Sequence, residues 1–239
     1  MWNGKQISVI FPTYNEKESI YQAIEDFFAS GYVDEIVVVN NNAAPGTAEE
    51  VARTRAKQVF EPQQGYGAAI RRGFREVDPA SDYIIVSEPD GTFSGRDVIK
   101  LLAYANDFEY VLGTRTSREF IWAGANMGRF LKWGNWAVAK MVEFLFNTTL
   151  LTDVGCTMRL IRRDSLDRLE SQFTVETSHF GLEMTLLVIT NRIRLVEIPV
   201  HYMKRVGVSS VTGSTYKAFK LGMTMIFMIL AHRLKTLWD

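Results

Sequence analysis

Two carboxylates stand two positions apart at the end of an apolar run. Residues 84–93 read IIVSEPDGTF, so Glu88 and Asp90 follow a predicted buried strand. In open α/β sheets, ligands bind just outside the carboxyl ends of the strands. A divalent cation that holds a diphosphate takes hard oxygen ligands. The pair therefore predicts a metal-assisted diphosphate site, although an acidic turn after a strand would look the same in isolation.

A second group of polar residues closes the first predicted strand. Residues 12–16 read PTYNE, in which Pro12 turns the chain while Tyr14 and Glu16 offer a ring and a carboxylate to a base and a ribose. The same residues also suit an ordinary strand-to-helix turn. In that interpretation Asn15 caps the helix, and Glu18 completes a capping-box pair.

Two further segments combine turn residues with binding potential. The second strand ends in Asn40, Asn41 and Asn42, whose amides can recognise a base edge or a ribose hydroxyl, or can simply form a turn. Residues 64–73 place Gly65 and Gly67 at the start of a helix, where free N–H groups can bind an anion. Small residues there would equally permit close packing. The spacing is neither that of a Walker loop nor that of a dinucleotide fingerprint.

Apolar runs and helical periodicity alternate along the chain. The predicted strands cover residues 7–11, 35–39, 58–60, 83–86, 110–113 and 194–198. The predicted helices cover residues 15–31, 47–56, 67–77, 94–105, 126–146, 181–191 and 216–237. Apolar strands separated by helices indicate a parallel sheet covered on both faces. Pro199 limits the last strand to an edge or an end.

Composition narrows the class and the location of the protein. The chain has 239 residues, 47% of them hydrophobic, which allows one large α/β domain with an appended element. Its 27 basic and 27 acidic residues leave no global field, so no nucleic-acid partner is expected. Cys156 is the single cysteine, which excludes an intramolecular disulfide. Without a signal pattern or a spanning apolar stretch, we expect a cytoplasmic protein.

The motifs together resemble a known family. They are residues 12–16, 65–68, 88–91, 153–159 (DVGCTMR), 197–200 (EIPV), 205–207 and 209–210. In this order they resemble the family 2 glycosyltransferases with the GT-A fold, and among them the dolichol- or polyprenyl-phosphate sugar synthases. The resemblance runs from about residue 6 to about residue 215. It implies an α/β GT-A domain at 1–215, with a mostly parallel sheet flanked by helices, and a C-terminal amphipathic helical segment at 216–239.

The resemblance also implies a donor site with a metal ion. The implied ligands of the nucleotide sugar are Pro12, Tyr14, Glu16, Asn40, Asn42, Gly67, Glu88, Asp90 and Arg205. Glu88 and Asp90 are the implied ligands of Mg²⁺ or Mn²⁺. Glu88 stands where the family usually has aspartate, and the asparagine run stands where it has an acid. Arg205 either closes over the diphosphate or is a solvated loop arginine.

The acceptor decides whether a base is needed. A lipid phosphate is already ionised, and Arg115, Arg129 and Glu183 are the predicted acceptor residues. A glycan hydroxyl would need a base, for which Asp153 is the catalytic candidate. Asp153 would otherwise be a loop cap or the ion-pair partner of Arg159. In the resembling lipid-phosphate enzymes a serine stands one turn after the helix arginine, whereas here Trp133 follows Arg129.

Two predicted helices are more apolar than solvent-facing helices usually are. Residues 126–146 and 216–237 carry wide apolar faces edged by lysine and arginine, a pattern typical of a membrane interface. These faces would alternatively pack on each other or on a second copy of the chain, which makes a homo-oligomer possible. We therefore expect the protein to lie peripherally on the cytoplasmic face of the membrane.

These features lead to one expected activity and several competitors. We expect a metal-dependent, inverting transfer of a hexose from a UDP- or GDP-sugar to a polyprenyl phosphate, with inversion implied by the resemblance alone. The alternatives are transfer to a hydroxyl of a polysaccharide or lipid-linked glycan, and a non-catalytic sugar-nucleotide-binding subunit. A nucleotidyltransferase would need a glycine-rich, basic loop after the first strand, which residues 12–16 do not provide.

Overall fold

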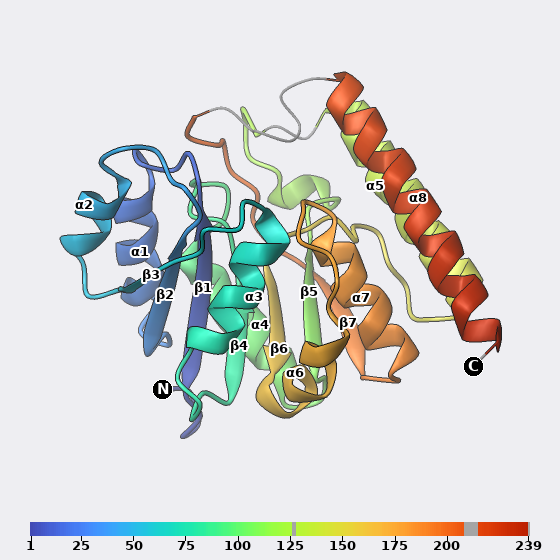
Figure 1. Cartoon of the computed structure of the whole chain (residues 1–239), viewed down its shortest axis with the longest axis horizontal. Coiled ribbons are helices and arrows are strands. Elements are labelled where there is room, and N and C mark those ends of the chain that lie inside the picture. The colour runs from blue at the N-terminus through green and yellow to red at the C-terminus, as the bar shows by residue number, and fades with distance from the viewer. Residues whose placement is uncertain (126–127, 208–214, 239) are drawn as a thin grey trace.

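A seven-stranded sheet forms the centre of the protein. The computed structural model describes residues 1–125, 128–207 and 215–238 (Figure 1). The strands are β1 (Ile7–Thr13), β2 (Glu35–Asn40), β3 (Lys57–Phe60), β4 (Tyr83–Val86), β5 (Tyr110–Thr114), β6 (Arg159–Arg162) and β7 (Leu195–Pro199). Their order across the sheet is β3-β2-β1-β4-β6-β5-β7. This arrangement confirms the predicted GT-A-like, mostly parallel sheet, with the last strand at an edge.

Helices cover both faces of the sheet. They are α1 (Ile20–Ala29), α2 (Thr47–Ala52), α3 (Tyr66–Glu76), α4 (Val98–Ala105), α5 (Arg129–Phe146), α6 (Arg163–Leu169), α7 (Phe180–Thr190) and α8 (Thr215–Trp238). In Figure 1, α3, α6 and α7 lie on the near face, with α4 behind the sheet. Four β-strand interiors are almost wholly apolar and buried, so burial of these runs holds the layers together.

Strand β6 was not predicted, and it is antiparallel to both neighbours. Its register pairs Ile84 with Ile161 and Val111 with Leu160, so it lies between β4 and β5. The strand is short and has arginine at both ends, which gives little hydrophobic signal. Because β6 runs opposite to its neighbours, its first residue lies at the end of the sheet where the parallel strands finish. Residues 153–158 therefore approach the site from the same end as the acidic loop, which carries Glu88 and Asp90.

The start of the first helix also differs from the prediction. Helix α1 begins at Ile20, and Asn15 does not cap it. The Glu16 carboxylate instead accepts hydrogen bonds from the backbone N–H groups of Tyr14 and Asn15, at 2.6 and 2.7 Å. The backbone N–H groups of Ser19 and Ile20 donate to the Glu16 carbonyl. Residues 14–19 are thus a turn, and strand β1 continues through Pro12 to Thr13.

Helices α5 and α8 form a pair at one end of the molecule. They lie side by side beyond the β5–β7 end of the sheet and contact α7 (Figure 1). Ala139, Val142 and Ile229 are fully buried within this packing. Trp133, Phe144 and Phe227 remain 64–85% exposed on the outside. No helix in the described ranges is long and apolar enough to span a bilayer.

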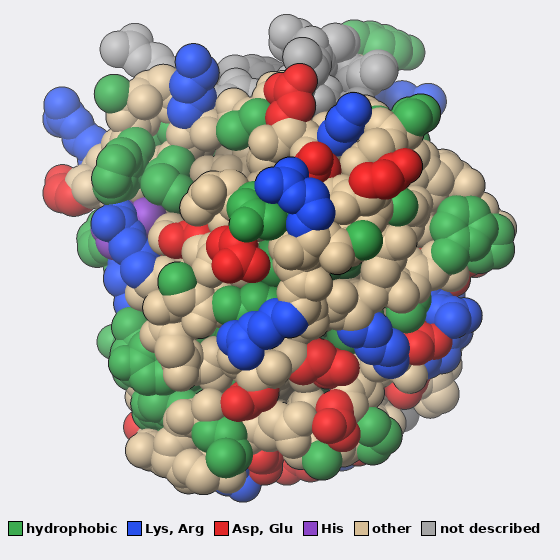
Figure 2. Space-filling view, turned by 90° about the vertical axis from the view of Figure 1, so that its left-hand side faces the viewer, with side chains coloured by type: hydrophobic (Ala, Val, Ile, Leu, Met, Phe, Trp, Pro, Cys, Tyr) green, Lys and Arg blue, Asp and Glu red, His purple; other side chains and the backbone are tan. Residues whose placement is uncertain are grey.

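The opposite end of the molecule has an ordinary polar surface. Figure 2 shows the face on the α1, α2 and β3 side, where acidic and basic side chains are interspersed over the visible surface. Examples from that side are the ion pairs Arg53–Glu50, at 2.6 Å, and Lys57–Glu76, at 3.1 Å. The two ends of the sheet therefore differ in the chemistry they present to solvent.

Candidate functional site

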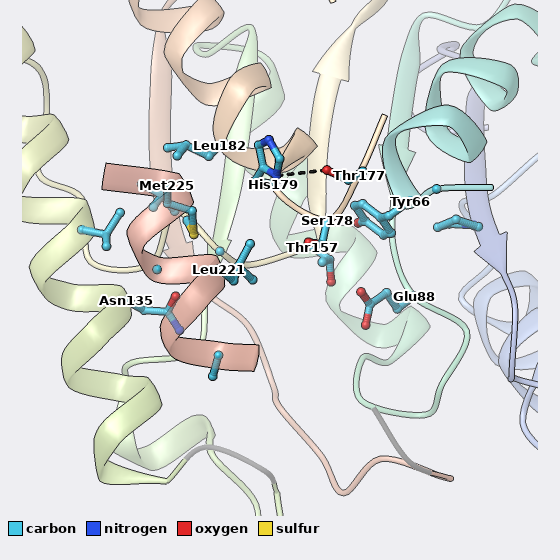
Figure 3. A pocket seen from close by; sticks show the side chains of 18 of the residues that line it. Tyr66, Glu88, Asn135, Thr157, Thr177, Ser178, His179, Leu182, Leu221 and Met225 are labelled. Atoms are coloured by element: carbon cyan, nitrogen blue, oxygen red, sulfur yellow. Dashed lines mark hydrogen bonds between the residues drawn. The ribbon is translucent and has the colours of Figure 1, made fainter. Parts of the chain in front are cut away.

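A single cavity runs from the carboxyl ends of the central strands to the α5–α8 helix pair. Its volume is about 640 Å³. The polar end is lined by Pro12, Tyr14, Glu16, Glu88 and Arg205, which were predicted donor-site residues, and by Arg115, a predicted acceptor residue. Figure 3 shows the cavity from close by, with Glu88 and Tyr66 on one side and Leu221 and Met225 of α8 on the other. Distant parts of the chain thus border one space.

Asp90 lies buried behind the polar end of the cavity. Its Oδ1 accepts hydrogen bonds from the Thr92 backbone N–H (2.9 Å) and the Thr92 hydroxyl (2.5 Å). Its Oδ2 faces the Arg205 guanidinium, with 2.5 Å between Nη1 and Oδ2. Thr92 therefore fixes the carboxylate so that one oxygen points toward a positive charge.

Three carboxylates lie around the guanidinium of Arg205. Besides Asp90 it contacts Glu16, at 3.0 Å, and Glu88, at 3.5 Å. Burial, and then the neighbouring Asp90 carboxylate, raise the pKa of Glu88 to about 8. Burial also raises the pKa of Glu16, against the opposing effect of its hydrogen bonds and of Arg205. Even with Arg205 beside it, Glu88 therefore keeps its proton to a higher pH than an exposed glutamate does.

The segment that carries Arg205 is fastened to the acidic loop by its backbone. The Met203 N–H donates to the Thr92 carbonyl, at 2.9 Å, and the Val206 N–H donates to the Asp90 carbonyl, at 2.8 Å. Gly91 has φ of +81°, a left-handed conformation that glycine adopts without steric cost. Residues 203–206 thus lie across the acidic loop, which explains why Arg205 meets Asp90.

The three asparagines after β2 have separate roles. Asn41 is buried, and its side chain bonds the Glu61 and Gln63 carbonyls and the Gly65 N–H, so it ties β2 to the loop before α3. Asn41 borders the cavity, whereas the predicted Asn40 and Asn42 do not. Asn40 accepts a hydrogen bond from the Ala43 N–H, and Asn42 bonds the Pro62 carbonyl. These two amides hold the turn, and their predicted contact with the nucleotide stays a prediction.

The two glycines before α3 serve close packing in this structure. A Cβ on Gly65 would lie 2.1 Å from the Glu176 carbonyl oxygen, and one on Gly67 would lie 2.4 Å from that of Val175. The Ala68 N–H donates to the Glu176 carbonyl, at 3.0 Å, so it is not free for an anion. Gly67 lies outside the cavity lining, while Tyr66 between the two glycines is part of it. The observed contacts of Gly67 are therefore packing contacts.

Asp153 is paired with Arg115 and not with Arg159. Arg115 donates from Nε and Nη2 to the two carboxylate oxygens, at 2.8 and 2.9 Å, and its backbone N–H donates at 3.0 Å. Asp153 is fully buried. Burial disfavours the Arg115 charge, yet the Asp153 carboxylate holds the pKa of Arg115 well above its usual range. The bidentate pair leaves Asp153 poorly placed to accept a proton from an acceptor hydroxyl.

Of the two other predicted acceptor residues, Glu183 does not line the cavity, and the side chain of Arg129 is not described. Glu183 is buried, and its carboxylate accepts hydrogen bonds from the Thr174 and Val175 N–H groups and the Thr174 hydroxyl. It therefore braces the segment before α7, and the cavity lining does not include it. Arg129 is the first residue of α5, and its side chain lies outside the described residues. Its role in acceptor binding stays a prediction.

Several residues that border the cavity were not among the predicted site residues. Arg159 is buried and donates to the Tyr110 hydroxyl (2.9 Å) and to the carbonyls of Gly181 (2.6 Å) and Cys156. Tyr66, Thr157 and His179 also line the cavity. Their positions in the sequence could have indicated them, because Tyr66 lies between the two glycines of one motif and Thr157 lies within the motif 153–159.

The far end of the cavity is apolar. It is lined by Ala137 and Val138 of α5, Leu182 of α7, and Leu221, Met225 and Ile226 of α8. His179 stands between the two ends and bonds the Thr177 hydroxyl, at 3.1 Å (Figure 3). Burial lowers the pKa of His179. A molecule that filled the whole cavity would need a charged head and an apolar tail.

Glu88 and Asp90 fit a divalent cation only in part. Asp90 Oδ2 is already oriented toward a positive partner, the Arg205 guanidinium. Within the described part of the chain, no group of three or more His, Cys, Asp or Glu side chains is arranged to hold a metal ion. A cation here would take its remaining ligands from phosphate oxygens and water, as Mg²⁺ commonly does.

Comparisons with known proteins agree with this geometry. The family model described as glycosyl transferase family 2 matches residues 8–170. The chain is 27% identical over 207 residues to a dolichyl-phosphate hexose transferase of Haloferax volcanii, covering 84% of each chain. It is 30% identical over 219 residues to an uncharacterized glycosyltransferase of Mycobacterium bovis, covering 88% of this chain and 92% of the relative.

Solved structures show the same fold. The glucosyl-3-phosphoglycerate synthase of Mycobacterium tuberculosis, in complex with Mn²⁺, UDP and phosphoglyceric acid, superposes with a TM-score of 0.74 at 15% identity. The match covers 96% of this chain and 79% of that chain. The same enzyme with Mn²⁺, UDP-glucose and phosphoglyceric acid gives a TM-score of 0.74, also at 15% identity. At this identity the likeness concerns the fold alone.

Proposed function

Because the chain belongs to glycosyl transferase family 2 and is a glycosyltransferase, we propose that it transfers a hexose from a UDP- or GDP-sugar to a polyprenyl phosphate of the dolichyl type. The observation that carries this proposal is the shape of the cavity, which is polar beside Glu88 and apolar between α5, α7 and α8. A nucleotide sugar suits the first part, and a prenyl phosphate suits the second.

The donor occupies the polar end in this proposal. Tyr14 lies at the carboxyl end of β1 and is 43% exposed, so its ring is available to a base. Arg205 contributes a guanidinium, which pairs well with phosphate oxygens. A diphosphate that arrives with a divalent cation would meet the carboxylates of Glu88 and Asp90 and, beside them, this guanidinium. Mn²⁺ accompanies UDP in the superposed mycobacterial enzyme, which supports Mn²⁺ or Mg²⁺ here.

The acceptor phosphate enters from the apolar end. An ionised phosphate oxygen forms a bond to the anomeric carbon while the bond from that carbon to the diphosphate breaks, and the diphosphate takes the negative charge. No proton has to be removed from the nucleophile. This agrees with the structure, in which Asp153 is held by Arg115 and is not free to act as a base. The bound cation would supply Lewis-acid stabilisation of the departing diphosphate.

The outer faces of α5 and α8 suit a membrane surface. Large apolar side chains are exposed there, among them Trp133, Phe144 and Phe227. Basic residues such as Lys220 and Lys235 are also exposed on α8. We propose that this helix pair, with the segment 216–239 as its second member, lies on the cytoplasmic face of the membrane. Pairing of the same faces in a homo-oligomer is the competing arrangement.

Transfer to a hydroxyl of a glycan is the second candidate. It requires Asp153 as the base, and the 2.8 Å ion pair with Arg115 speaks against that role. A sugar-nucleotide-binding subunit without catalysis is a third candidate, for which Glu88 in place of aspartate is the motivating feature. The name of the Haloferax volcanii relative favours the lipid phosphate over both.

One assay separates these candidates. The protein is incubated with radiolabelled UDP-glucose, UDP-galactose or GDP-mannose, with Mn²⁺ or with chelator, and with either a polyprenyl phosphate or the corresponding polyprenol. We expect one donor to label the polyprenyl phosphate in the presence of Mn²⁺, with no labelling of the polyprenol. Equal labelling of phosphate and alcohol, or labelling of an added glycan alone, would contradict the proposed acceptor. Donor binding without any transfer would favour the binding subunit.

A further inference from the structure

Two hydroxyl groups beside the acidic pair have no hydrogen-bond partner among the described residues. They are the Tyr66 phenol and the Thr157 hydroxyl, and the oxygen atoms of both are buried. Tyr66 begins α3, whereas Thr157 lies between β5 and β6 in the chain, so separate elements bring them together. Figure 3 shows Tyr66, Thr157 and Glu88 directed toward the same part of the cavity.

Such groups are uncommon because they cost free energy. A buried donor or acceptor that lacks a partner destabilises the folded state by about 1–3 kcal/mol. A phenylalanine and a valine would have nearly the same shapes and would avoid this cost. Burial, and then the charge of Glu88, raise the pKa of Tyr66 well above its usual range, so its hydroxyl keeps the proton it can donate. The hydroxyls are therefore available to a bound molecule.

The backbone around Tyr66 is fixed by packing. The flanking Gly65 and Gly67 approach the Val175 and Glu176 carbonyls so closely that a Cβ on either would overlap them. Segment 175–176 is itself held by Glu183, whose carboxylate accepts the Val175 N–H at 3.0 Å. The backbone position of Tyr66 is thus fixed on segment 175–176, and such support is what a selective contact requires.

From these observations we infer that Tyr66 and Thr157 bind hydroxyl groups of the transferred sugar and determine which hexose the enzyme accepts. The inference rests on the proposed function, because it takes the cavity to hold a nucleotide sugar with its diphosphate at Glu88 and Asp90. The sugar then lies beyond the diphosphate, next to Tyr66, Thr157 and Glu88. Epimers differ in the direction of one hydroxyl, and a site that pairs with that hydroxyl rejects the wrong epimer.

The test uses binding, so it does not depend on the acceptor. Calorimetry measures the affinity for UDP, UDP-glucose and UDP-galactose, and for GDP and GDP-mannose, with Mn²⁺ present. The variants are Tyr66→Phe and Thr157→Val, and the matched control is Tyr104→Phe, which removes a phenol on α4 that is 44% exposed and outside the cavity. We expect each cavity variant to reduce the preference between sugars by about fivefold to tenfold. Affinity for the free nucleotide should stay within twofold.

Stability and free-nucleotide affinity distinguish this role from a structural one. A merely structural hydroxyl would change the melting temperature and leave the preference between sugars intact. That result in both cavity variants would overturn the inference, as would a parallel loss of affinity for UDP. A wild-type protein that binds no nucleotide would overturn the proposed function and this inference together. Absence of transfer to a polyprenyl phosphate, with selective donor binding intact, would overturn only the proposed acceptor.

Discussion

The two ends of the cavity are built on different principles. At the polar end, charged side chains are held by partners of opposite charge, as in the Arg205 cluster and the Arg115–Asp153 pair. At the apolar end, α5 and α8 present small and flexible side chains such as Ala137 and Met225, with few directional contacts. The first arrangement fixes one geometry. The second adapts to a chain of variable conformation, for which methionine is well suited.

This difference teaches where specificity lies. Selection of the donor depends on fixed hydrogen bonds and charges, and a single substitution there should have a large effect. Recognition of the acceptor tail depends on the volume between two helices, and only a change of shape should disturb it. The face at the other end of the sheet instead presents interspersed acidic and basic side chains to solvent (Figure 2). The following predictions test this contrast, from the largest expected effect to the smallest.

The largest effect is expected at the Arg115–Asp153 pair. In Arg115→Met, Asp153 is left buried without its bidentate partner, and such a loss typically costs about 3–5 kcal/mol of unfolding free energy. Urea denaturation measures the change. Arg118→Met is the matched control, because Arg118 is exposed and should change stability by less than about 0.5 kcal/mol. A loss below about 1 kcal/mol in Arg115→Met would show that this end is not held by the ion pair.

A similarly large effect is expected on catalysis at Asp90. Asp90→Asn keeps the shape of the side chain and removes its charge, so kcat/KM should fall by about 10²–10³ and Mn²⁺ should no longer strengthen UDP binding. The measurements are steady-state kinetics and calorimetry with and without chelator. Asp167→Asn is the control, because the Asp167 side chain is 60% exposed on α6. Metal-dependent binding that survives in Asp90→Asn would remove Asp90 from the proposed metal site.

A smaller effect concerns pH and Glu197 on β7. Burial raises the pKa of Glu197 to about 7, against hydrogen bonds from Thr152 and Asp153. Between its ordinary value of 4.5 and about 7, the folded state binds a proton that the unfolded state lacks, so stability falls as pH rises. Glu197→Gln should reduce the loss of unfolding free energy between pH 5 and pH 8 by about 1–2 kcal/mol, allowing for partial exposure. Urea denaturation at pH 5 and pH 8 checks it, and an unchanged slope would contradict the assignment.

The sequence predicted the polar end better than the apolar end. The strand that ends at Val86 and the acidic pair after it could be predicted, because an apolar run is followed directly by two carboxylates. The contact between Arg205 and Asp90 joins residues more than a hundred positions apart, and the sequence did not predict it. An ion pair with Arg159 was one of the alternatives for Asp153, whereas the observed partner is Arg115, since spacing along the chain does not determine which guanidinium folds toward it.

Other differences follow from local geometry. In the asparagine run, Asn41 borders the cavity while its two neighbours hold the turn, and composition alone does not distinguish the three. Strand β6 was missed because four residues with arginine at each end give no clear period. The apolar end depends on how α5, α7 and α8 pack on one another. Amphipathic patterns identify such helices, but they do not reveal the space between them.

The central claim is that the acceptor chain lies between α5 and α8, and one pair of variants tests it most directly. Leu221→Trp fills the apolar end of the cavity, whereas Leu234→Trp places the same side chain at a position on α8 that is 59% exposed and outside the cavity. Transfer to a polyprenyl phosphate and calorimetric binding of the nucleotide sugar are measured for both. We predict that Leu221→Trp abolishes transfer and keeps donor binding, while Leu234→Trp keeps both. Full transfer by Leu221→Trp would contradict the account.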